Sequence, residues 1–253
     1  MSTSKTFKAL HHSDAPLLLG NVWDARTTQL AQQAGFAAVG TSSHAIAIAL
    51  GYKDGEEISP ETLLFIIKHI MKVATVPVSV DFESGYSNHP PEVWDNLQPF
   101  VELGIAGINL EDGQVQDGKR VLGDAELMAK KIRAIRGSSD IFINARVDTF
   151  TTKHPDALNE AIRRALIYRI AGADGIFVPL LEKEEDIKEF VSKVDSPLNV
   201  FTTPNLPVYD VLAKLGVKRI SHGGKQYDQL MKKSEAIYTD FQQTKDYKLV
   251  LGS

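Results

Sequence analysis

The stretch VPVSVDFESGY, residues 76–86, contains the side chains whose types and spacing most clearly suggest chemistry. Five β-favouring, largely apolar residues lead into Asp81 and Glu83, which predicts a buried strand with both acids at its end. Side chains two apart on a strand point to the same side. Two neighbouring carboxylates repel each other unless a proton or a cation lies between them. The spacing therefore predicts a site for a cation or a shared proton.

The same pattern, an apolar run that ends in polar residues, recurs along the chain. Segments that favour strands lie at residues 17–22, 37–43, 76–83, 107–112, 141–148, 175–180, 198–203 and 217–221. Between them lie segments with helical periodicity, such as SPETLLFIIKHIMKVA, in which Ser59 can cap a helix and Pro60 suits its first turn. Four glycines stand where such helices need a left-handed residue to end, namely Gly35, Gly104, Gly172 and Gly216.

This alternation predicts an α/β fold in which helices cover a parallel sheet. Eight strand–helix units in 253 residues favour a closed (β/α)8 barrel of the TIM type over an open sheet. No linker divides the chain, so we expect a single domain over residues 1–253, with residues 223–253 as a C-terminal helical segment. In such a barrel the carboxyl ends of the strands meet at one mouth, which brings their polar residues together.

Three acids from neighbouring strands then predict a metal site. Asp81, Glu83 and Glu111 would converge at the mouth with few positive charges to balance them. Carboxylate oxygens without histidine or cysteine partners favour Mg²⁺ or Mn²⁺ over zinc. A single serine or threonine at a strand end is better explained as a helix cap, but that explanation does not extend to the three acids.

Composition excludes several other classes of protein. The net charge is −4 and no basic run occurs, which argues against binding to nucleic acid or to an anionic membrane surface. The absence of cysteine excludes disulfides, thiolate metal sites and a cysteine nucleophile or acid. The longest apolar stretch, AIAIAL, is too short to span a bilayer, and the first residues lack the apolar core of a secretory signal. We therefore expect a cytoplasmic protein.

Several segments, in their order and spacing, resemble the isocitrate lyase and phosphoenolpyruvate mutase superfamily. They are GNVWDARTTQLAQQAGFAAVGTSS, LGYKDGE, VPVSVDFESGY, GINLED, INARVD and GADGIFVP, and together they cover most of the chain. The chain resembles a less characterised branch with a DxExGY metal motif. The resemblance implies a barrel enzyme that binds Mg²⁺ and a small 2-oxo or 2-hydroxy carboxylate, and that makes or breaks a bond next to a pyruvate enolate.

The resemblance also implies roles for the acids. Asp81 corresponds to the direct metal ligand, while Glu83 and Glu111 would hold the ion directly or through its waters. Asp54, in LGYKDGE, matches an acidic residue near the metal and the substrate, which makes it a catalytic candidate. An aspartate between lysine and glycine is also typical of a turn.

Ser42, Ser43 and His44 match the loop that grips the substrate carboxylate and the enolate oxygen. His44 departs from the better-known members, and a loop histidine without a special role explains it equally well. Arg146 corresponds to a substrate-binding and catalytic arginine, whose planar fork suits a carboxylate or a phosphonate. Asn144 would share its strand face and contact the substrate at the mouth.

The gating loop departs from the family pattern. Lyases of the superfamily carry a Lys-Arg-Cys-Gly-His loop whose cysteine acts as an acid, whereas this chain reads LEDGQVQDGKRVLGDAE. The lysine and asparagine of the mutases are not reproduced either. Lys119 is the catalytic candidate in this segment, and a solvated turn is the alternative.

These observations predict a Mg²⁺-dependent carbon–carbon lyase, similar to methylisocitrate lyase, that acts on a small carboxylate through an enolate. A phosphonomutase or phosphonate-cleaving enzyme is the second choice. A Schiff-base aldolase would need a strand lysine, for which Lys218 is the candidate, and a non-catalytic ligand-binding barrel is the remaining alternative. The family also implies a homo-oligomer, either a dimer or a tetramer.

Overall fold

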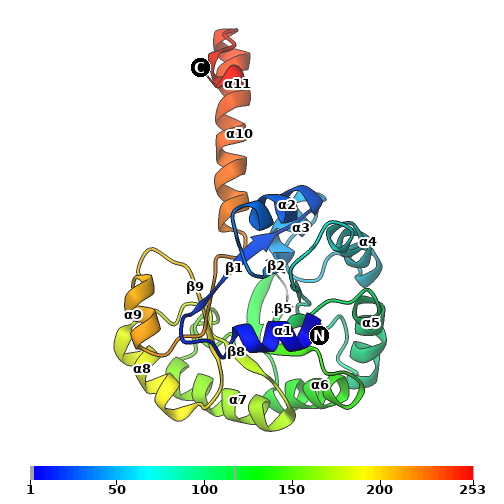
Figure 1. Cartoon of the computed structure of the whole chain (residues 1–253), viewed down its shortest axis with the longest axis vertical. Coiled ribbons are helices and arrows are strands. Elements are labelled where there is room, and N and C mark those ends of the chain that lie inside the picture. The colour runs from blue at the N-terminus through cyan, green and yellow to red at the C-terminus, as the bar shows by residue number, and fades with distance from the viewer. Residues whose placement is uncertain (1–2, 117, 253) are drawn as a thin grey trace.

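Eight parallel strands close into a barrel in the computed structural model of the chain, which describes residues 3–116 and 118–252 (Figure 1). The hydrogen-bonded order is β1-β10-β9-β8-β7-β4-β3-β2, and the pairing of β1 with both β2 and β10 closes the ring. The strands are β1 (Leu17–Val22), β2 (Val39–Thr41), β3 (Val78–Asp81), β4 (Gly107–Glu111), β7 (Phe142–Arg146), β8 (Gly175–Phe177), β9 (Leu198–Phe201) and β10 (Arg219–Ser221). The predicted (β/α)8 barrel is confirmed.

The helices are α1 (Thr3–Leu10), α2 (Ala25–Gln33), α3 (Ser43–Ala49), α4 (Pro60–Met71), α5 (Pro90–Glu102), α6 (Ala125–Ser138), α7 (Ala157–Ala171), α8 (Glu184–Lys193), α9 (Tyr209–Lys214), α10 (Lys225–Thr244) and α11 (Lys248–Leu251). Helices α2 to α9 lie in the connections between the barrel strands, whereas α1 precedes β1, and α10 and α11 follow β10 (Figure 1). None of the described helices is both long enough and apolar enough to cross a membrane.

Local signals in the sequence form the expected structures. The Ser59 side chain accepts a hydrogen bond from Thr62 N at the start of α4, and Pro60 occupies the first turn. One face of α4 buries Leu63 and Ile67, four residues apart, against the barrel. The four glycines predicted to end helices all have positive φ angles, between 88° and 113°.

The amino end of the barrel is covered by α1. Phe7 of this helix is fully buried and packs with Leu17 and Phe142, which stand at the amino ends of their strands. The His11 ring stacks on Phe142 at a centroid distance of 4.0 Å. This end is therefore filled with side chains, and the functional site must be sought at the carboxyl ends of the strands.

A hairpin that the sequence interpretation did not foresee follows β4 at that carboxyl end. It consists of the antiparallel strands β5 (Gly113–Gln116) and β6 (Lys119–Leu122), in the segment expected to be a gating loop. The sequence does contain one signal for a hairpin, the dipeptide Asp117-Gly118 between QVQ and KRV, which the sequence interpretation did not use. The hairpin places Leu122 opposite Gly113, near the end of β4, and Lys119 opposite Gln116, farther from it.

The helix α10 begins at the barrel and projects away from it for most of its length (Figure 1). Near its start, the buried Tyr227 contacts Trp23 edge to face, with ring centroids 5.3 Å apart. Farther along, large apolar side chains are exposed, among them Leu230, Met231, Tyr238 and Phe241.

Candidate active site

A cavity of about 260 Å³ opens at the carboxyl ends of the barrel strands. Asp81 ends β3, Glu111 ends β4 and Arg146 ends β7, so three neighbouring strands deliver charged groups to one place. The cavity brings together most of the predicted site residues, namely Ser42, Ser43, His44, Asp54, Asp81 and Arg146.

Asp81 is held by hydrogen bonds to both of its carboxylate oxygens. Oδ2 accepts from Ser43 N at 3.2 Å and from Ser43 Oγ at 2.7 Å. Oδ1 accepts from Asn109 Nδ2 at 3.2 Å. The Ser43 amide thus serves Asp81, and the Ser42 amide binds the Val22 carbonyl at 3.0 Å. These two amides, expected from the family resemblance to grip the substrate, are bonded within the protein in this structure.

Glu83 reaches the site by a different route from the one the strand pattern predicted. The strand β3 ends at Asp81, so the two acids are not alternate residues of one strand. Glu83 instead has a φ angle of 51°, in the left-handed region that non-glycine residues rarely occupy. It is only 4% exposed, and no hydrogen bond to its carboxyl group is found among the described residues. Burial, together with the charges of Glu111 and Asp81, raises the pKa of Glu83.

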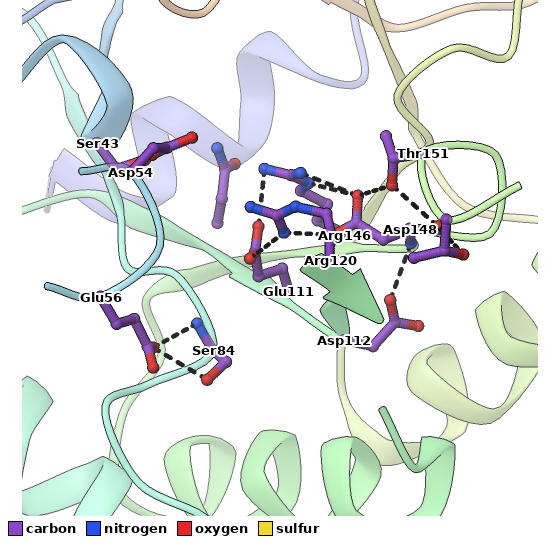
Figure 2. Close-up of polar contacts among 12 residues, drawn as sticks. Ser43, Asp54, Glu56, Ser84, Glu111, Asp112, Arg120, Arg146, Asp148 and Thr151 are labelled. Carbon is purple, nitrogen blue, oxygen red and sulfur yellow. Dashed lines mark hydrogen bonds and ion pairs between the residues drawn. The ribbon is translucent and has the colours of Figure 1, made fainter. Parts of the chain in front are cut away.

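Glu56 fixes the turn that contains Glu83 (Figure 2). Its Oε1 accepts from Ser84 N at 2.8 Å, from Ser84 Oγ at 3.0 Å and from Tyr86 N at 3.0 Å. The segment that carries Asp54 is therefore clamped to the segment that follows β3. This clamp explains how the strained backbone at Glu83 is maintained.

Glu111 lies among two arginines and a second carboxylate (Figure 2). Arg120 Nη1 lies 2.5 Å from Glu111 Oε1 and 3.1 Å from Asp148 Oδ2. Arg146 Nη1 lies 2.7 Å from Glu111 Oε2, while its Nε and Nη2 donate to Asp148 Oδ1 at 3.1 and 2.9 Å. Burial nevertheless raises the pKa of Glu111 to about 7, although both arginines act in the opposite direction.

Arg120 reaches the site, whereas the residue predicted from the sequence, its neighbour Lys119, does not. Lys119 is exposed on the hairpin, and no contact between it and the cavity is found. Arg120 is the next residue of β6, so its side chain leaves the opposite face and reaches Glu111. The alternation along a strand could have separated the two, but only if the hairpin had been predicted.

Asn144 lies below the cavity rather than in its wall. It is 1% exposed, and its Nδ2 donates to Asn109 Oδ1 at 2.9 Å and to Asn199 Oδ1 at 3.1 Å. Asn144 and Arg146 do point to the same side of β7, but Asn144 is two residues nearer the amino end. Side chains on the same side of a barrel strand can therefore lie either at the mouth or in the interior, depending on their position along the strand.

His44 connects the cavity to α10. Its Nδ1 lies 3.7 Å from Asp54 Oδ2, and its Nε2 lies 3.0 Å from Asp228 Oδ1 in the first turn of that helix. Asp54 and then Asp228 raise the pKa of His44 to about 9, against the effect of burial. His44 is therefore a charged group in the cavity wall, which sequence reasoning could not foresee because Asp228 is distant in the chain.

Behind the mouth, a second network holds Asp112. Its Oδ1 accepts from Asp148 N at 2.8 Å, and its Oδ2 accepts from Tyr168 at 2.6 Å and from Arg164 at 3.1 Å. Arg164 Nε also donates to Glu160, at 2.7 Å. This network ties the end of β4 and the segment after β7 to α7.

Lys218, the candidate for a Schiff base, lies at the wrong end of the barrel. It precedes β10, and its Nζ donates to the Ser13 carbonyl at 3.0 Å. It is therefore on the amino side of the strands, away from the cavity. Lys218 therefore cannot serve as the Schiff-base lysine that the aldolase alternative requires.

The chemistry of the acids fits a divalent cation. Glu111 Oε2 is buried and accepts no hydrogen bond from the described residues, because the close contact with Arg146 lacks hydrogen-bond geometry. Glu83 is buried, and its carboxyl group has no hydrogen bond among the described residues. Burial, followed by repulsion from Glu111 and Asp81, raises its pKa. Among residues 3–116 and 118–252, however, no three acid or histidine side chains are grouped closely enough to share one ion as they stand. Side-chain movement is required before Asp81, Glu83 and Glu111 could hold one.

Such a barrel, with acids and an arginine at its carboxyl-end mouth, has the architecture of a TIM-barrel enzyme site. The model of the phosphoenolpyruvate phosphomutase family matches residues 7–241, and the chain belongs to this family. It is thereby a member of the phosphoenolpyruvate mutase and isocitrate lyase superfamily, as the sequence resemblance predicted.

Named relatives include lyases and mutases. An uncharacterised Mycobacterium tuberculosis protein is 35% identical over 223 residues, which cover 88% of this chain and 83% of the relative. The 2-methylisocitrate lyase of Halalkalibacterium halodurans is 29% identical over 199 residues, which cover 76% of this chain and 65% of that enzyme. A Burkholderia cenocepacia structure described as a candidate phosphonomutase is 35% identical, with a TM-score of 0.87. The match covers 94% of this chain and 99% of that one.

A phosphonopyruvate hydrolase solved with oxalate and Mg²⁺ has a TM-score of 0.86 at 22% identity, with coverage of 98% of this chain and 89% of that one. At this identity the likeness concerns the fold alone.

Proposed function

We propose that the protein is a Mg²⁺-dependent enzyme that cleaves a carbon–carbon bond in a small 2-oxo or 2-hydroxy carboxylic acid through a pyruvate-type enolate. The observation that carries the proposal is the meeting of Asp81 and Arg146 in one cavity, beside the buried carboxyl groups of Glu83 and Glu111. This arrangement suits an anionic substrate that bridges Arg146 and a metal ion. The lyases among the relatives support the reaction class.

Asp81, Glu83 and Glu111 would hold the metal ion. When bound, Mg²⁺ would supply positive charge to the developing enolate oxygen. Asp81 is already oriented by Ser43 and Asn109. The buried surroundings of Glu83 and Glu111 exclude water, which strengthens every charge interaction at the mouth.

Arg146 would bind the substrate carboxylate. It lines the cavity, and its guanidinium lies 5.8 Å from the centre of the Phe177 ring. Asp148, to which it donates twice, fixes the plane of the guanidinium. A fixed fork suits a carboxylate better than a flexible ammonium does.

His44 and Asp54 would handle the proton for which the known lyases use a loop cysteine. The raised pKa keeps His44 protonated at neutral pH, and both residues line the cavity. A protonated imidazole beside a carboxylate can act as a general acid. This pair also gives Asp54 the catalytic role suggested by the sequence.

A phosphonomutase or phosphonate-cleaving activity is the second candidate. The 35% identity to the Burkholderia structure favours it, and the same anion and enolate sites would serve a phosphonate. A barrel that binds ligand without turnover is the third outcome.

One set of assays separates these functions. The protein with Mg²⁺ would be incubated with 2-methylisocitrate, 2,3-dimethylmalate, oxaloacetate and phosphonopyruvate, with products followed by proton and phosphorus NMR. We expect carbon–carbon cleavage that stops on chelation and in Asp81→Ala, but not in Asp95→Ala, an exposed aspartate of α5. Turnover of phosphonopyruvate alone would favour the second candidate. Binding without turnover, or turnover that survives chelation, would contradict the proposal.

The proposal includes a homo-oligomer, either a dimer or a tetramer. The exposed apolar residues of the projecting α10 would be covered by another copy of the chain. Light scattering after gel filtration would measure the mass. A monomer at micromolar concentration would contradict this part.

A further inference from the structure

Arg219 is a buried cation in the interior of the barrel, below the site. It is 1% exposed, and its Nε and Nη1 have no hydrogen-bond partner among the described residues. Within residues 3–116 and 118–252, no carboxylate lies within ion-pair distance of Arg219. Burial lowers the pKa of Arg219 to about 9, with the charge of Asp81 acting in the opposite direction. The Phe7 ring centre lies 5.9 Å from its guanidinium.

Stability does not explain an arginine at this position. A buried charge without an ionic partner is unfavourable, and an apolar side chain of similar length would avoid that cost. The Phe7 ring offers such a side chain an apolar neighbour. We therefore look for the reason for an arginine in the one hydrogen bond that its side chain makes among the described residues.

That bond goes to Asn109, which in turn contacts Asp81. Arg219 Nη2 donates to Asn109 Oδ1 at 3.2 Å, and Asn109 Nδ2 donates to Asp81 Oδ1 at 3.2 Å. Arginine can only donate, and an ionised carboxylate can only accept. An amide between the two satisfies both in one orientation, with its oxygen toward Arg219 and its nitrogen toward Asp81.

The adjacent amides follow the same polarity. Asn144 Nδ2 donates to Asn109 Oδ1 and to Asn199 Oδ1, and Asn199 Nδ2 donates to Ser221 Oγ at 3.2 Å. Asn199 Nδ2 also donates to the Val200 and Arg219 carbonyls, at 2.7 and 3.3 Å. These carbonyls and the Asp81 carboxylate can only accept, so they face amide nitrogens, whereas the Arg219 guanidinium can only donate and faces the Asn109 oxygen.

We propose that Arg219 is a positioning residue that fixes the orientation of Asn109 and, through it, of Asp81. Arg219 does not touch the cavity and acts only through Asn109. The consequence for turnover rests on the proposed function, whereas the orientation of Asn109 does not.

Three variants test this role. Arg219→Met removes the donor, Arg219→Lys keeps a group that only donates, and Arg164→Met is a matched loss of a buried arginine that belongs to a different network. Each would be measured by thermal unfolding and by the side-chain amide signals of Asn109 in ¹⁵N–¹H NMR. The third measurement is turnover of whichever substrate the assays of the proposed function identify.

In Arg219→Met we expect an unfolding temperature equal to or above that of the wild type, shifted and faster-exchanging Asn109 amide signals, and turnover lowered by about 10- to 100-fold. In Arg219→Lys the Asn109 signals and turnover should stay close to the wild type. Arg164→Met should unfold at a lower temperature with the Asn109 signals in place.

Two results would overturn the inference. Unchanged Asn109 signals in Arg219→Met would show that Arg219 does not orient this amide. A large loss of stability or failure of that variant to fold would show a structural role instead. If the wild type turns over none of the substrates, the proposed function fails, and the NMR comparison still decides the role of Arg219.

Discussion

Two networks of buried ion pairs lie side by side in this barrel, and they differ in how completely their charges are satisfied. In the rear network, both oxygens of Asp112 accept hydrogen bonds, from the Asp148 amide, Tyr168 and Arg164. In the mouth network, Arg120 and Arg146 compensate Glu111 and Asp148, yet Glu111 Oε2 accepts no hydrogen bond from any residue that the structure describes.

Glu83 increases this difference in charge compensation between the two networks. It adds a buried carboxyl group to the mouth, and no further arginine or lysine of the described residues pairs with it. Buried polar groups are normally satisfied, so a deficit at one place needs an explanation. The rear network has a structural role, because it connects the ends of two strands to α7. The mouth network leaves one buried carboxylate oxygen without a hydrogen bond among the described residues, and groups with perturbed pKa values cluster at functional sites.

The largest effect should come from breaking the satisfied network. Arg164→Met would leave Asp112 buried without its cation, which should lower the free energy of unfolding by about 3 to 5 kcal/mol. Urea denaturation would measure the change. Arg163→Met is the control, because this side chain is 54% exposed and also pairs with Glu160, so its loss should cost less than about 1 kcal/mol. Equal costs for the two variants would remove the distinction between buried and exposed partners.

At the mouth, Glu83→Gln should weaken metal binding without lowering the stability of the fold. Removing a repelled, buried carboxylate should leave the free energy of unfolding unchanged or higher, while Mn²⁺ affinity falls by about 10- to 100-fold. Electron paramagnetic resonance of free Mn²⁺ would report the affinity. Glu102→Gln, an exposed change at the end of α5, should alter neither quantity. A destabilised Glu83→Gln variant with intact affinity would assign Glu83 to the scaffold.

A smaller effect is expected from the hairpin arginine. Arg120 occupies the same Glu111 that a metal ion would use, so Arg120→Gln should raise Mn²⁺ affinity by about tenfold. Hydrogen exchange in β5 and β6 should become faster, since the hairpin loses its contact with the mouth. The neighbouring exposed change Lys119→Gln should affect neither measurement. Matching results for the two variants would mean that the contact of Arg120 has no energetic weight.

The smallest effect concerns the connection to α10. The pKa of His44 is raised from 6.5 to about 9, so its charge interactions stabilise the folded state below about pH 6.5 and are lost as the pH rises to about 9. Unfolding temperatures of the wild type and His44→Gln should therefore differ at pH 6 and converge near pH 10. A constant difference across this range would attribute the contribution of His44 to packing.

Some residues could be assigned from the chain alone because their signals are local. Ser59 and Pro60 start a helix through contacts within one turn, and Gly172 ends one because it adopts a φ angle of 113°. Asp81 could also be placed, since it follows an apolar strand and the barrel directs every strand end to one mouth. These inferences need no knowledge of distant partners.

Other residues were assigned incompletely because their roles depend on depth and on irregular backbone. Asn144 shares a strand face with Arg146, but only the closed barrel shows that it lies in the interior. Glu83 was expected on the strand, and the structure places it in a left-handed turn beyond the strand end. Periodicity describes the direction of a side chain and contains no measure of its height in a barrel.

The sequence by itself determined the eight strand–helix units, the helix caps and the strand-end acids, because hydrophobic periodicity and capping act over a few residues. Only the tertiary structure decided that Arg120 rather than Lys119 reaches Glu111, and that Asp228 binds His44. It also decided that Arg219 is linked to Asp81 by hydrogen bonds through Asn109. These contacts join residues 9, 184 and 110 positions apart for Arg120–Glu111, His44–Asp228 and Arg219–Asn109, respectively. Their energies come from burial and from charges whose partners are chosen by the closure of the barrel, which no local pattern encodes.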